Sequence, residues 1–226
     1  MNSKLYLVST PIGNLKDITL RAIEVLSSVD VIACEDTRKT GLMLQKLNIV
    51  NKPQLLSYYE ENEQGRIPQI VNFLKEGKNV VLVSNAGTPT ISDPGYKLVR
   101  ECLNQRIQVE PIPGASSVLT ALTVSGLPTD RFLFLGFLSK KEGKRKKILE
   151  NLPLKTTIIF FESPFRLLKT LNKLKNIFGD IDIVICRELT KIYEEIRREK
   201  ISQSISYFEK TKPKGEFTLC FNIPPE

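Results

Sequence analysis

Histidine is missing from all 226 residues of this chain, and its absence removes whole classes of chemistry. Without it there is no histidine general base and no histidine-ligated metal site. Cysteine is scarce too: Cys34, Cys102, Cys186 and Cys220 lie far apart and form no CxxC pair. A disulfide framework or a zinc site would show closer, paired spacing. The sequence therefore predicts four reduced, buried thiols.

The chain also lacks any apolar run that approaches the roughly 18 residues needed by a membrane helix. Its first apolar run, residues 5–8, is too short for the core of a signal peptide. These absences predict a soluble, cytoplasmic protein. A chain of 226 residues, 41% of them hydrophobic, can bury the core of one large domain or of two smaller ones.

Positive charge exceeds negative charge by eight, and much of the surplus lies in one segment. Residues 140–147 contain six lysine or arginine side chains and one acidic residue, Glu142, so this segment alone contributes +5. Two interpretations stay open. The segment is either a solvated helix face or a surface for nucleic-acid phosphates, where lysine and arginine displace counterions.

Short apolar runs typical of strands alternate with amphipathic segments typical of helices. Strands are expected at residues 4–9, 29–34, 79–83, 107–112, 132–135, 156–161, 181–186 and 217–221. Helices are expected at residues 18–26, 62–76, 118–124 and 163–178, with Asn62 as an N-cap and Gly77 and Gly179 as terminators. Several strands are apolar throughout, as in strands covered on both faces. The alternation predicts an α/β protein.

A break at Pro111-Ile112-Pro113-Gly114 divides the chain. Two prolines and a glycine within four residues end a strand and turn the chain sharply. We place the boundary between two α/β domains here, at residues 1–113 and 114–226. Because pockets favour domain interfaces, a ligand cleft is expected between the two domains.

Four loops rich in glycine, proline and small polar residues follow directly after expected strands. They are residues 10–15, 35–38, 84–95 and 113–117. Ligands of open α/β sheets bind at such carboxyl ends of strands. The GxGxxG motif of dinucleotide-binding proteins and the GxxxxGK(S/T) motif of the P-loop are both absent, so neither kind of phosphate loop is expected.

Taken in order, these loops and several later motifs closely resemble one family of enzymes. The matching stretches are Thr10-Pro-Ile-Gly-Asn-Leu15 with Asp17-Ile-Thr19, Glu35-Asp-Thr-Arg38, Ala86-Gly-Thr-Pro89 with Ser92-Asp-Pro-Gly95, Pro113-Gly114, Ser125-Gly-Leu-Pro128, Gly136-Phe137, Glu162-Ser-Pro-Phe-Arg166, and Arg187-Glu-Leu-Thr-Lys191 with Glu195. The ordered set resembles the ribosomal RNA small subunit methyltransferase I family within the tetrapyrrole methylases, and the resemblance covers about residues 4–221. One departure is Asn85, where the family usually has an aspartate.

The resemblance implies a fold, an activity and a substrate. The implied fold has two α/β domains of the tetrapyrrole-methylase type, with the cofactor S-adenosylmethionine in the cleft between them. The implied enzyme is a homodimer that uses no metal. It methylates the ribose 2′-hydroxyl of a cytidine in the decoding region of small-subunit rRNA, in the assembled subunit.

The resemblance also assigns residues to the cofactor. They are Pro11, Asn85, Ala86, Gly87, Ile91, Ser116, Ser117, Phe160, Phe161 and Glu216. Backbone amides, small residues and apolar walls suit a cofactor that is mostly apolar apart from its methionine head and ribose hydroxyls. Because strand side chains alternate, one of Phe160 and Phe161 points into the core whatever the function.

A ribose hydroxyl is a weak acid, so a base or an oxyanion stabiliser would assist its attack. With histidine absent, the catalytic residues expected are Glu35, Asp36, Glu188 and Lys191, and Asp93 and Glu162 are further candidates. The choice among them stays open. The residues expected to contact RNA are Arg38, Lys144, Arg145, Lys146, Arg166 and Arg187.

Two other functions compete with this interpretation. A methyltransferase that acts on a tetrapyrrole in sirohaem or cobalamin synthesis would share the fold and the cofactor without needing the basic segment, although basicity alone does not exclude polycarboxylate substrates. A non-catalytic RNA-binding factor of ribosome assembly would keep the basic segment without needing the cofactor loops. The stretches Glu35-Asp-Thr-Arg38 and Arg187-Glu-Leu-Thr-Lys191 favour the RNA enzyme.

Overall fold

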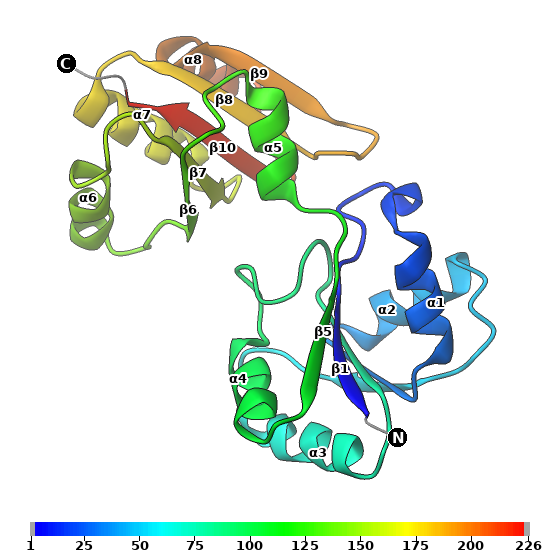
Figure 1. The fold of residues 1–226 in the computed structure, drawn as a ribbon. Helices are drawn as coiled ribbons and strands as arrows, with labels where there is room; N and C mark the ends of the chain where they lie inside the picture. The colour runs from blue at the N-terminus through cyan, green and yellow to red at the C-terminus, as the bar shows by residue number, and fades with distance from the viewer. Residues whose placement is uncertain (1–2, 224–226) are drawn as a thin grey trace. The chain divides into compact units, whose positions relative to one another are not determined.

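The computed structural model describes residues 3–223 and divides the chain into two compact units, Met1–Ser116 and Ser117–Glu226. Each unit contains one five-stranded sheet with helices packed against it (Figure 1). This architecture confirms the α/β class expected from the sequence. The division falls at Ser116, close to the break noted at Pro113.

The N-terminal unit has a fully parallel sheet. Its strands are β1 (Lys4–Val8), β2 (Val31–Cys34), β3 (Gln54–Ser57), β4 (Val80–Val83) and β5 (Gln108–Ile112), in the order β3-β2-β4-β1-β5. Its helices are the 3-10 turn η1 (Leu15–Asp17), α1 (Leu20–Ser28), α2 (Thr37–Lys46), α3 (Glu63–Lys75) and α4 (Tyr96–Asn104). Because the strands run in one direction, all of their carboxyl ends lie at the same edge of the sheet.

Apolar layers cover both faces of this sheet. The layer on one face includes Ala22 and Leu26 of α1, and the layer on the other includes Ile70 and Leu74 of α3. Along β2, Ile32 belongs to the first layer, whereas its neighbours on either side belong to the second. Burial on both faces explains why these strands are continuous apolar runs in the sequence.

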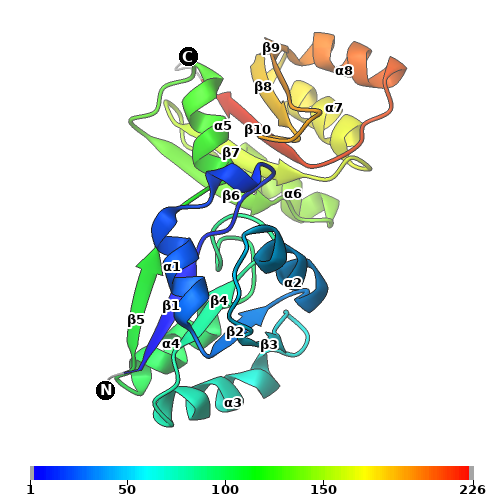
Figure 2. The same ribbon diagram turned by 90° about the vertical axis from the view of Figure 1, so that its right-hand side faces the viewer.

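The C-terminal unit has a mixed sheet. Its strands are β6 (Phe132–Phe137), β7 (Thr157–Glu162), β8 (Asp182–Arg187), β9 (Glu195–Lys200) and β10 (Phe217–Asn222), in the order β6-β7-β10-β8-β9. Its helices are α5 (Ser117–Ser125), α6 (Glu142–Glu150), α7 (Leu167–Phe178) and α8 (Ile201–Lys210). Figure 2 shows this sheet between α5 on one side and α7 and α8 on the other.

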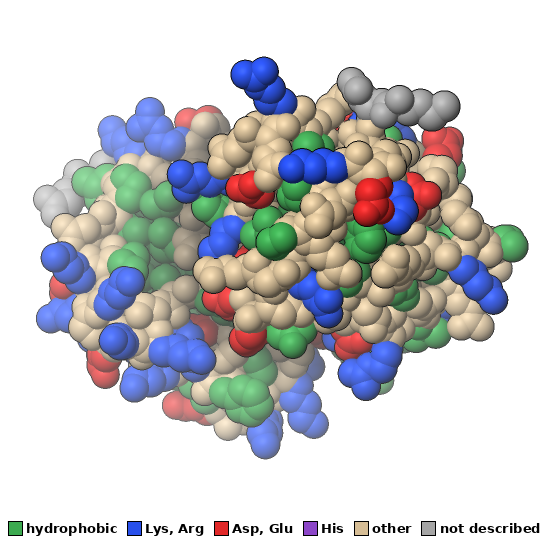
Figure 3. Space-filling view, turned by 90° about the horizontal axis from the view of Figure 1, so that it is seen from below, with side chains coloured by type: hydrophobic (Ala, Val, Ile, Leu, Met, Phe, Trp, Pro, Cys, Tyr) green, Lys and Arg blue, Asp and Glu red, His purple; other side chains and the backbone are tan. Residues whose placement is uncertain are grey.

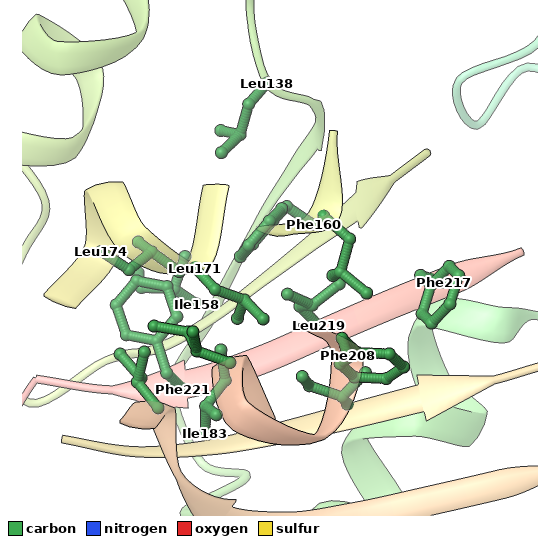
Figure 4. Packing of buried hydrophobic residues seen from close by; sticks show 14 of the residues in the cluster. Leu138, Ile158, Phe160, Leu171, Leu174, Ile183, Phe208, Phe217, Leu219 and Phe221 are labelled. Carbon is green, nitrogen blue, oxygen red and sulfur yellow. The ribbon is translucent and has the colours of Figure 1, made fainter. Parts of the chain in front are cut away.

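The core of the C-terminal unit lies between its sheet and the helices α6, α7 and α8. Figure 4 shows Phe160 of β7 and Phe221 of β10 packed among leucines of α7 and Phe208 of α8. The rings of Phe160 and Phe221 meet edge to face with their centroids 6.2 Å apart. Such aromatic burial dominates the stability of a core of this size.

Asn62 corrects one expectation about helix capping. It does stand at the N-cap position of α3, but its side chain makes no capping bond to the helix. Instead, its side-chain oxygen accepts the backbone N–H of Tyr59 at 2.8 Å, and its amide donates to the carbonyl of Ser57 at 3.2 Å. The residue therefore orders the loop before α3 rather than the helix itself.

All four cysteines are free and buried, as expected. Within residues 3–223, no helix is both long enough and apolar enough to cross a lipid bilayer.

Candidate active site

Four loops meet at the carboxyl edge of the N-terminal sheet. Residues 9–14 follow β1, residues 35–36 follow β2, residues 84–95 follow β4, and residues 113–116 follow β5. These loops carry Pro11, Asn85, Ala86, Gly87 and Ile91, which were expected to bind the cofactor. Since the strands are parallel neighbours, the loops form a single edge of the kind that binds ligands in open α/β sheets.

Hydrogen bonds tie three of these loops together. Thr10 and Gly87 exchange two backbone hydrogen bonds, of 2.9 and 3.0 Å. The Thr88 hydroxyl is 3.1 Å from the Ser9 hydroxyl and donates to the carbonyl of Ala115 at 3.2 Å. The loops after β1, β4 and β5 thus form one hydrogen-bonded framework.

Two glycines let the backbone come close within this framework. A Cβ at Gly114 would lie 3.0 Å from the Cβ of Ser9, closer than nearly all real Cβ contacts. Gly87 has a φ of +82°, which disfavours residues with a Cβ atom. The framework therefore consists of backbone and small side chains, which leaves room for a ligand to approach.

Glu35 connects the fourth loop to the others. Its carboxylate accepts the backbone N–H of Asn85 at 2.9 Å, so the loop after β2 holds the start of the loop after β4. The side chain of Asn85 does not make this contact, and the residue is exposed. The link to Glu35 therefore does not depend on whether position 85 carries asparagine or aspartate.

Asp93, in the loop after β4, has an acidity suited to proton transfer. Burial, followed by the negative charge of Glu35, raises its pKa from 3.8 to about 6, and a hydrogen bond with Ser84 opposes the rise. A carboxyl group with such a pKa is ionised at neutral pH and still basic enough to accept a proton. Sequence reasoning kept Asp93 only as a further candidate, because its burial cannot be read from a loop of turn-forming residues.

Asp36 has a structural task at the start of α2. Its carboxylate accepts the backbone N–H of Arg38 at 2.9 Å and of Lys39 at 3.3 Å, as an N-cap does. The side-chain hydrogen bond from Arg38 is the main cause that lowers the pKa of Asp36. These contacts make Asp36 a poor proton acceptor, which argues against the catalytic role expected for it. The Arg38 side chain pairs with Asp36 at 3.4 Å but is 91% exposed, so a phosphate can still reach its guanidinium.

The C-terminal sheet gathers its own loops at one edge. Strand β10 is antiparallel to both β7 and β8, and its first residue, Phe217, is opposite Glu162 of β7 and Arg187 of β8. The ends of β7 and β8 are therefore neighbours of the segment that leads into β10. This arrangement brings residues 162–166, 187–191 and 214–216 to the same edge.

Lys191 joins two acidic residues at this edge. Its ammonium group lies 2.9 Å from the Glu188 carboxylate and 3.0 Å from that of Glu216. Glu188 also accepts the backbone N–H of Glu216 at 2.8 Å. Gly215 permits this approach, because a Cβ there would lie 2.6 Å from the Glu188 carboxylate.

The network holds both Glu188 and Lys191 in their charged forms. Burial raises the pKa of Glu188, but the hydrogen bonds from Glu216 and Lys191 outweigh it, so the pKa is lowered overall. Burial lowers the pKa of Lys191, but its two carboxylate partners outweigh it, so the pKa is raised overall. Neither group is poised to take up a proton at neutral pH. Both are better suited to holding these loops than to the catalysis expected of them.

The two phenylalanines of β7 point to opposite faces of the sheet. Phe160 is fully buried in the core of the C-terminal unit, so the structure removes it from the expected cofactor residues. Phe161 is partly exposed on the other face, where its ring meets those of Phe134 and Phe137 at centroid distances of 5.0 and 5.4 Å. Phe161 is the member of the pair that a ligand can reach.

The basic residues expected to contact RNA differ in accessibility. Lys144 and Lys146 are exposed on α6, but Arg145 between them is only 3% exposed, and its Nε has no hydrogen-bond partner. A phosphate cannot reach a buried guanidinium, so Arg145 departs from its expected role. Sequence reasoning missed this because Arg145 lies in an unbroken basic run.

Arg166 and Arg187 are engaged within the protein. Arg166 donates to the carbonyl of Leu138 at 2.7 Å and forms an ion pair of 3.2 Å with the buried Glu162. Arg187 donates to the carbonyl of Lys214 at 2.7 Å and pairs with Glu195 at 3.2 Å. Both guanidinium groups are largely committed to positioning the edge of the C-terminal sheet.

Comparison with known proteins gives the family. The family of Tetrapyrrole (Corrin/Porphyrin) Methylases matches residues 4–204. The protein named ribosomal RNA small subunit methyltransferase I of Thermotoga maritima is 49% identical over 219 residues, which cover 97% of this chain and 98% of the relative. This chain belongs to the ribosomal RNA small subunit methyltransferase I family.

A second relative agrees with this membership, and solved structures share the fold. The methyltransferase I of Rickettsia prowazekii is 49% identical over 98% of this chain and 79% of the relative. Uroporphyrin-III C-methyltransferase from Thermus thermophilus has a TM-score of 0.71 with 18% identity, over 98% of this chain and 95% of that one. Its complex with S-adenosylhomocysteine gives a TM-score of 0.66 with 17% identity, over 98% of each chain. At these identities the solved structures establish the fold alone.

For this member of the methyltransferase I family, the geometry singles out Glu35 and Asp93 among the acidic candidates. Both lie in the loops at the carboxyl edge of the N-terminal sheet. Among residues 3–223, no group of three or more cysteine, aspartate or glutamate residues is arranged to hold a metal ion.

Proposed function

We propose that the protein transfers a methyl group from S-adenosylmethionine to the ribose 2′-hydroxyl of a cytidine in the decoding region of small-subunit rRNA. The observation that carries this proposal is the 49% identity, over nearly the full length of both chains, to a relative named ribosomal RNA small subunit methyltransferase I. The uroporphyrin methyltransferase shares the fold at only 18% identity. The RNA substrate is therefore favoured over a tetrapyrrole.

The loops at the carboxyl edge of the N-terminal sheet fit the cofactor. Gly87 and Gly114 stand where a Cβ would meet Ile12 or Ser9, so the backbone can approach a ligand closely. Pro11, Asn85, Ala86 and Ile91 flank them, and Ser116, Ser117, Phe161 and Glu216 remain in the proposed set by resemblance. When bound, S-adenosylmethionine supplies an electrophilic methyl group, and most of the acceleration comes from aligning it with the incoming oxygen.

Asp93 is the residue we assign to the proton of the ribose hydroxyl. It is ionised at neutral pH yet has a pKa of about 6, so it accepts a proton more readily than an ordinary aspartate. Glu35 acts as a positioning residue, because it holds the backbone of Asn85 and raises the pKa of Asp93. Glu188 and Lys191 hold the loops at the edge of the C-terminal sheet.

Exposed basic side chains supply the affinity for RNA in this proposal. Arg38, Lys144 and Lys146 are exposed, and lysine and arginine at a surface release counterions when they meet phosphates. Lysine and arginine side chains project at many points of the face shown in Figure 3. The proposal also includes a homodimer that acts in the cytoplasm on the assembled small subunit, as the family resemblance implies.

The test is methyl transfer from labelled S-adenosylmethionine to small ribosomal subunits taken from cells that lack this protein. Free rRNA and a tetrapyrrole precursor are incubated in parallel. Label on a cytidine ribose of the subunit RNA supports the proposal and locates the nucleotide. Label on the tetrapyrrole alone overturns the substrate, and no label on any of the three overturns the activity.

Single-turnover rates separate the assignment of Asp93 from the activity itself. The Asp93→Asn variant is expected to lose roughly 10²-fold or more of the rate, which is typical for removal of a general base. Asp130→Asn, an exposed aspartate of the C-terminal unit, is the control and should keep the wild-type rate. A full rate in Asp93→Asn would leave the activity standing and remove Asp93 from the chemistry.

A further inference from the structure

Two exposed phenylalanines lie at the same edge of the C-terminal sheet, where the parallel strands β6 and β7 end. Phe137 ends β6, and Phe165 follows β7, which is parallel to β6. Their next neighbours in the chain, Leu138 and Arg166, are joined by a hydrogen bond of 2.7 Å. Phe137 is 58% exposed and Phe165 is 94% exposed.

The backbone that carries these rings is firmly anchored. Leu138 is buried in the core of the C-terminal unit, and it fixes the chain just after Phe137. Glu162 is fully buried and accepts the hydroxyl of Thr170 at 2.5 Å and the N–H of Ser163 at 2.8 Å. Its ion pair with Arg166 fixes the chain just after Phe165. Much of both side chains is therefore exposed to water on an anchored backbone. Such exposure of apolar surface is unfavourable, and a group stacked on the rings would relieve it.

Three exposed lysines follow Phe137 closely in the chain. Lys140 and Lys141 follow Phe137 after two residues of loop, and Lys144 lies on the first turns of α6. All three side chains are exposed, and among residues 3–223 no carboxylate lies within ion-pair distance of them. The only acidic residue of this segment, Glu142, is instead shared by Lys169 and Lys173 of α7. We call Phe137, Phe165, Lys140, Lys141 and Lys144 the aromatic–lysine edge.

We propose that the aromatic–lysine edge binds unpaired nucleotides of the RNA substrate, with bases stacked on Phe137 and Phe165 and phosphates beside the three lysines. The inference rests on the proposed function and specifies the form of RNA that this surface takes. Aromatic rings bind single-stranded nucleic acid because every unpaired base offers a face for stacking. A continuous duplex keeps its bases stacked on one another and offers none.

The affinity for a short labelled RNA of about 12 nucleotides tests the proposal in the full-length protein. Phe165→Ala is expected to weaken binding of the single strand about tenfold, since stacking on an aromatic ring contributes roughly one such factor or more per base. Phe165→Tyr should bind like the wild type because it keeps the ring, and Phe165→Leu should resemble Phe165→Ala. A duplex of the same length should bind more weakly and should not respond to these changes.

Phe132→Ala is the matched control. Phe132 is also an exposed phenylalanine of β6, but it begins the strand and therefore lies at the opposite end from Phe137. Its replacement should leave the affinity unchanged, whereas Phe137→Ala should reduce it. Replacement of Lys140 and Lys144 by glutamine should flatten the dependence of affinity on salt by about 0.7 per lysine in a plot of log K against log salt.

Three outcomes overturn the proposal. The first is unchanged affinity of Phe165→Ala for the single strand. The second is an equal loss of affinity for the duplex, which would show a general effect on charge or folding. The third is a change of sedimentation coefficient in Phe165→Ala without RNA, because the ring would then be covered by a second copy of the chain.

Methyl transfer to small subunits keeps this result distinct from the proposed function. If the wild type methylates the subunit and Phe165→Ala does so with unchanged affinity, the aromatic–lysine edge is wrong and the activity stands. If the wild type transfers no methyl group but Phe165→Ala binds the single strand more weakly than the wild type does, the aromatic–lysine edge is upheld as an RNA-binding surface. The proposed activity is then wrong.

Discussion

The carboxylate of Glu35 accepts the backbone N–H of Asn85 at 2.9 Å, and this single contact joins the ends of two neighbouring strands. The same carboxylate contributes to the raised pKa of Asp93, farther along the loop that begins at Asn85. The side chain of Glu35 therefore both fixes the start of this loop and raises the pKa of Asp93 within it. Burial of Asp93, and after it the charge of Glu35, raise the pKa of this carboxyl group to about 6 in a chain without histidine.

Replacement of Asp93 by asparagine should stabilise the protein above pH 6. The folded-state pKa of about 6 lies above the ordinary value of 3.8, so the folded chain holds its proton at pH values where the unfolded chain has lost it. Ionisation of Asp93 therefore reduces stability as the pH rises from about 4 through 6. Because the residue is partly exposed, we expect Asp93→Asn to gain only about 1–2 kcal/mol at pH 8.

Thermal or urea unfolding at pH 4 and pH 8 measures this gain. At pH 4 the aspartate is protonated in the folded chain and little more than half ionised in the unfolded chain, so most of the advantage of Asp93→Asn should be lost. Asp130→Asn, in which an exposed aspartate is replaced, should show no such dependence on pH. A variant that is equally destabilised at both pH values would contradict the assignment of a raised pKa.

Replacement of Gly215 by alanine should destabilise the edge of the C-terminal sheet. Gly215 has a φ of +93°, and an added Cβ would lie 2.6 Å from the carboxylate of Glu188. That carboxylate cannot move aside freely, because Lys191 and the N–H of Glu216 hold it. We expect a loss of about 2–3 kcal/mol, from backbone strain and displacement of the Glu188 carboxylate together.

Gly126→Ala provides the comparison for Gly215→Ala. Gly126 has a similar φ of +76°, but an added Cβ would meet no atom within 4 Å. Its loss of stability should therefore be limited to backbone strain, about 1 kcal/mol. Urea unfolding measures both losses in the free energy of unfolding. Equal losses in the two variants would show that the close approach to Glu188 does not contribute to the cost of Gly215→Ala.

The strands that bury both faces could be predicted from the sequence, because their apolar runs leave a clear signal. The strands β3 and β9 left no such signal. Strand β3 has only two apolar residues, and β9 has the sequence Glu-Ile-Arg-Arg-Glu-Lys. Both are edge strands held by backbone pairing with a neighbour. The charges of β9 pair with one another along the strand, as in Arg197 with Glu195 and Glu199.

The candidate site could be predicted only in part from the sequence. Loop positions follow from the strands, so the sequence located residues 84–95 and 113–117 at the carboxyl edge, although Ser117 proves to begin α5. Burial does not follow from composition. The sequence could not distinguish the buried Arg145 from the exposed Lys144 beside it, nor show that Asp36 caps α2. Roles that depend on contacts between distant segments required the structure.

The four thiols should resist modification in the folded protein. Burial raises the pKa of Cys102 to about 11 and that of Cys186 to about 12. Burial also raises the pKa of Cys34 and Cys220. Since the thiolate is the reactive form, very little of it exists at pH 8, and access is blocked as well. An alkylating reagent should label none of the thiols rapidly in buffer and all of them in denaturant. Rapid labelling of any one in buffer would contradict its burial.

Replacement of Thr170 by valine should destabilise the C-terminal unit, because Thr170 donates a hydrogen bond to the buried carboxylate of Glu162. The Thr170 hydroxyl donates to Glu162 at 2.5 Å, and neither side chain reaches solvent. Valine has nearly the same shape but no donor, so the charged oxygen would lose a partner that water cannot replace. We expect a loss of about 1–3 kcal/mol in the free energy of unfolding.

Thr123→Val separates this effect from the change of residue type. Thr123 also lies in a helix and donates to a backbone carbonyl, that of Thr120, but it is exposed. Water can take over the bond there, so its replacement should change stability by less than about 0.5 kcal/mol. If Thr170→Val were as mild, Arg166 and the N–H of Ser163 would satisfy Glu162 by themselves. Arg166 and Ser163 would then hold the chain beside Phe165 without help from Thr170, and Arg166→Ala should lower the affinity for single-stranded RNA.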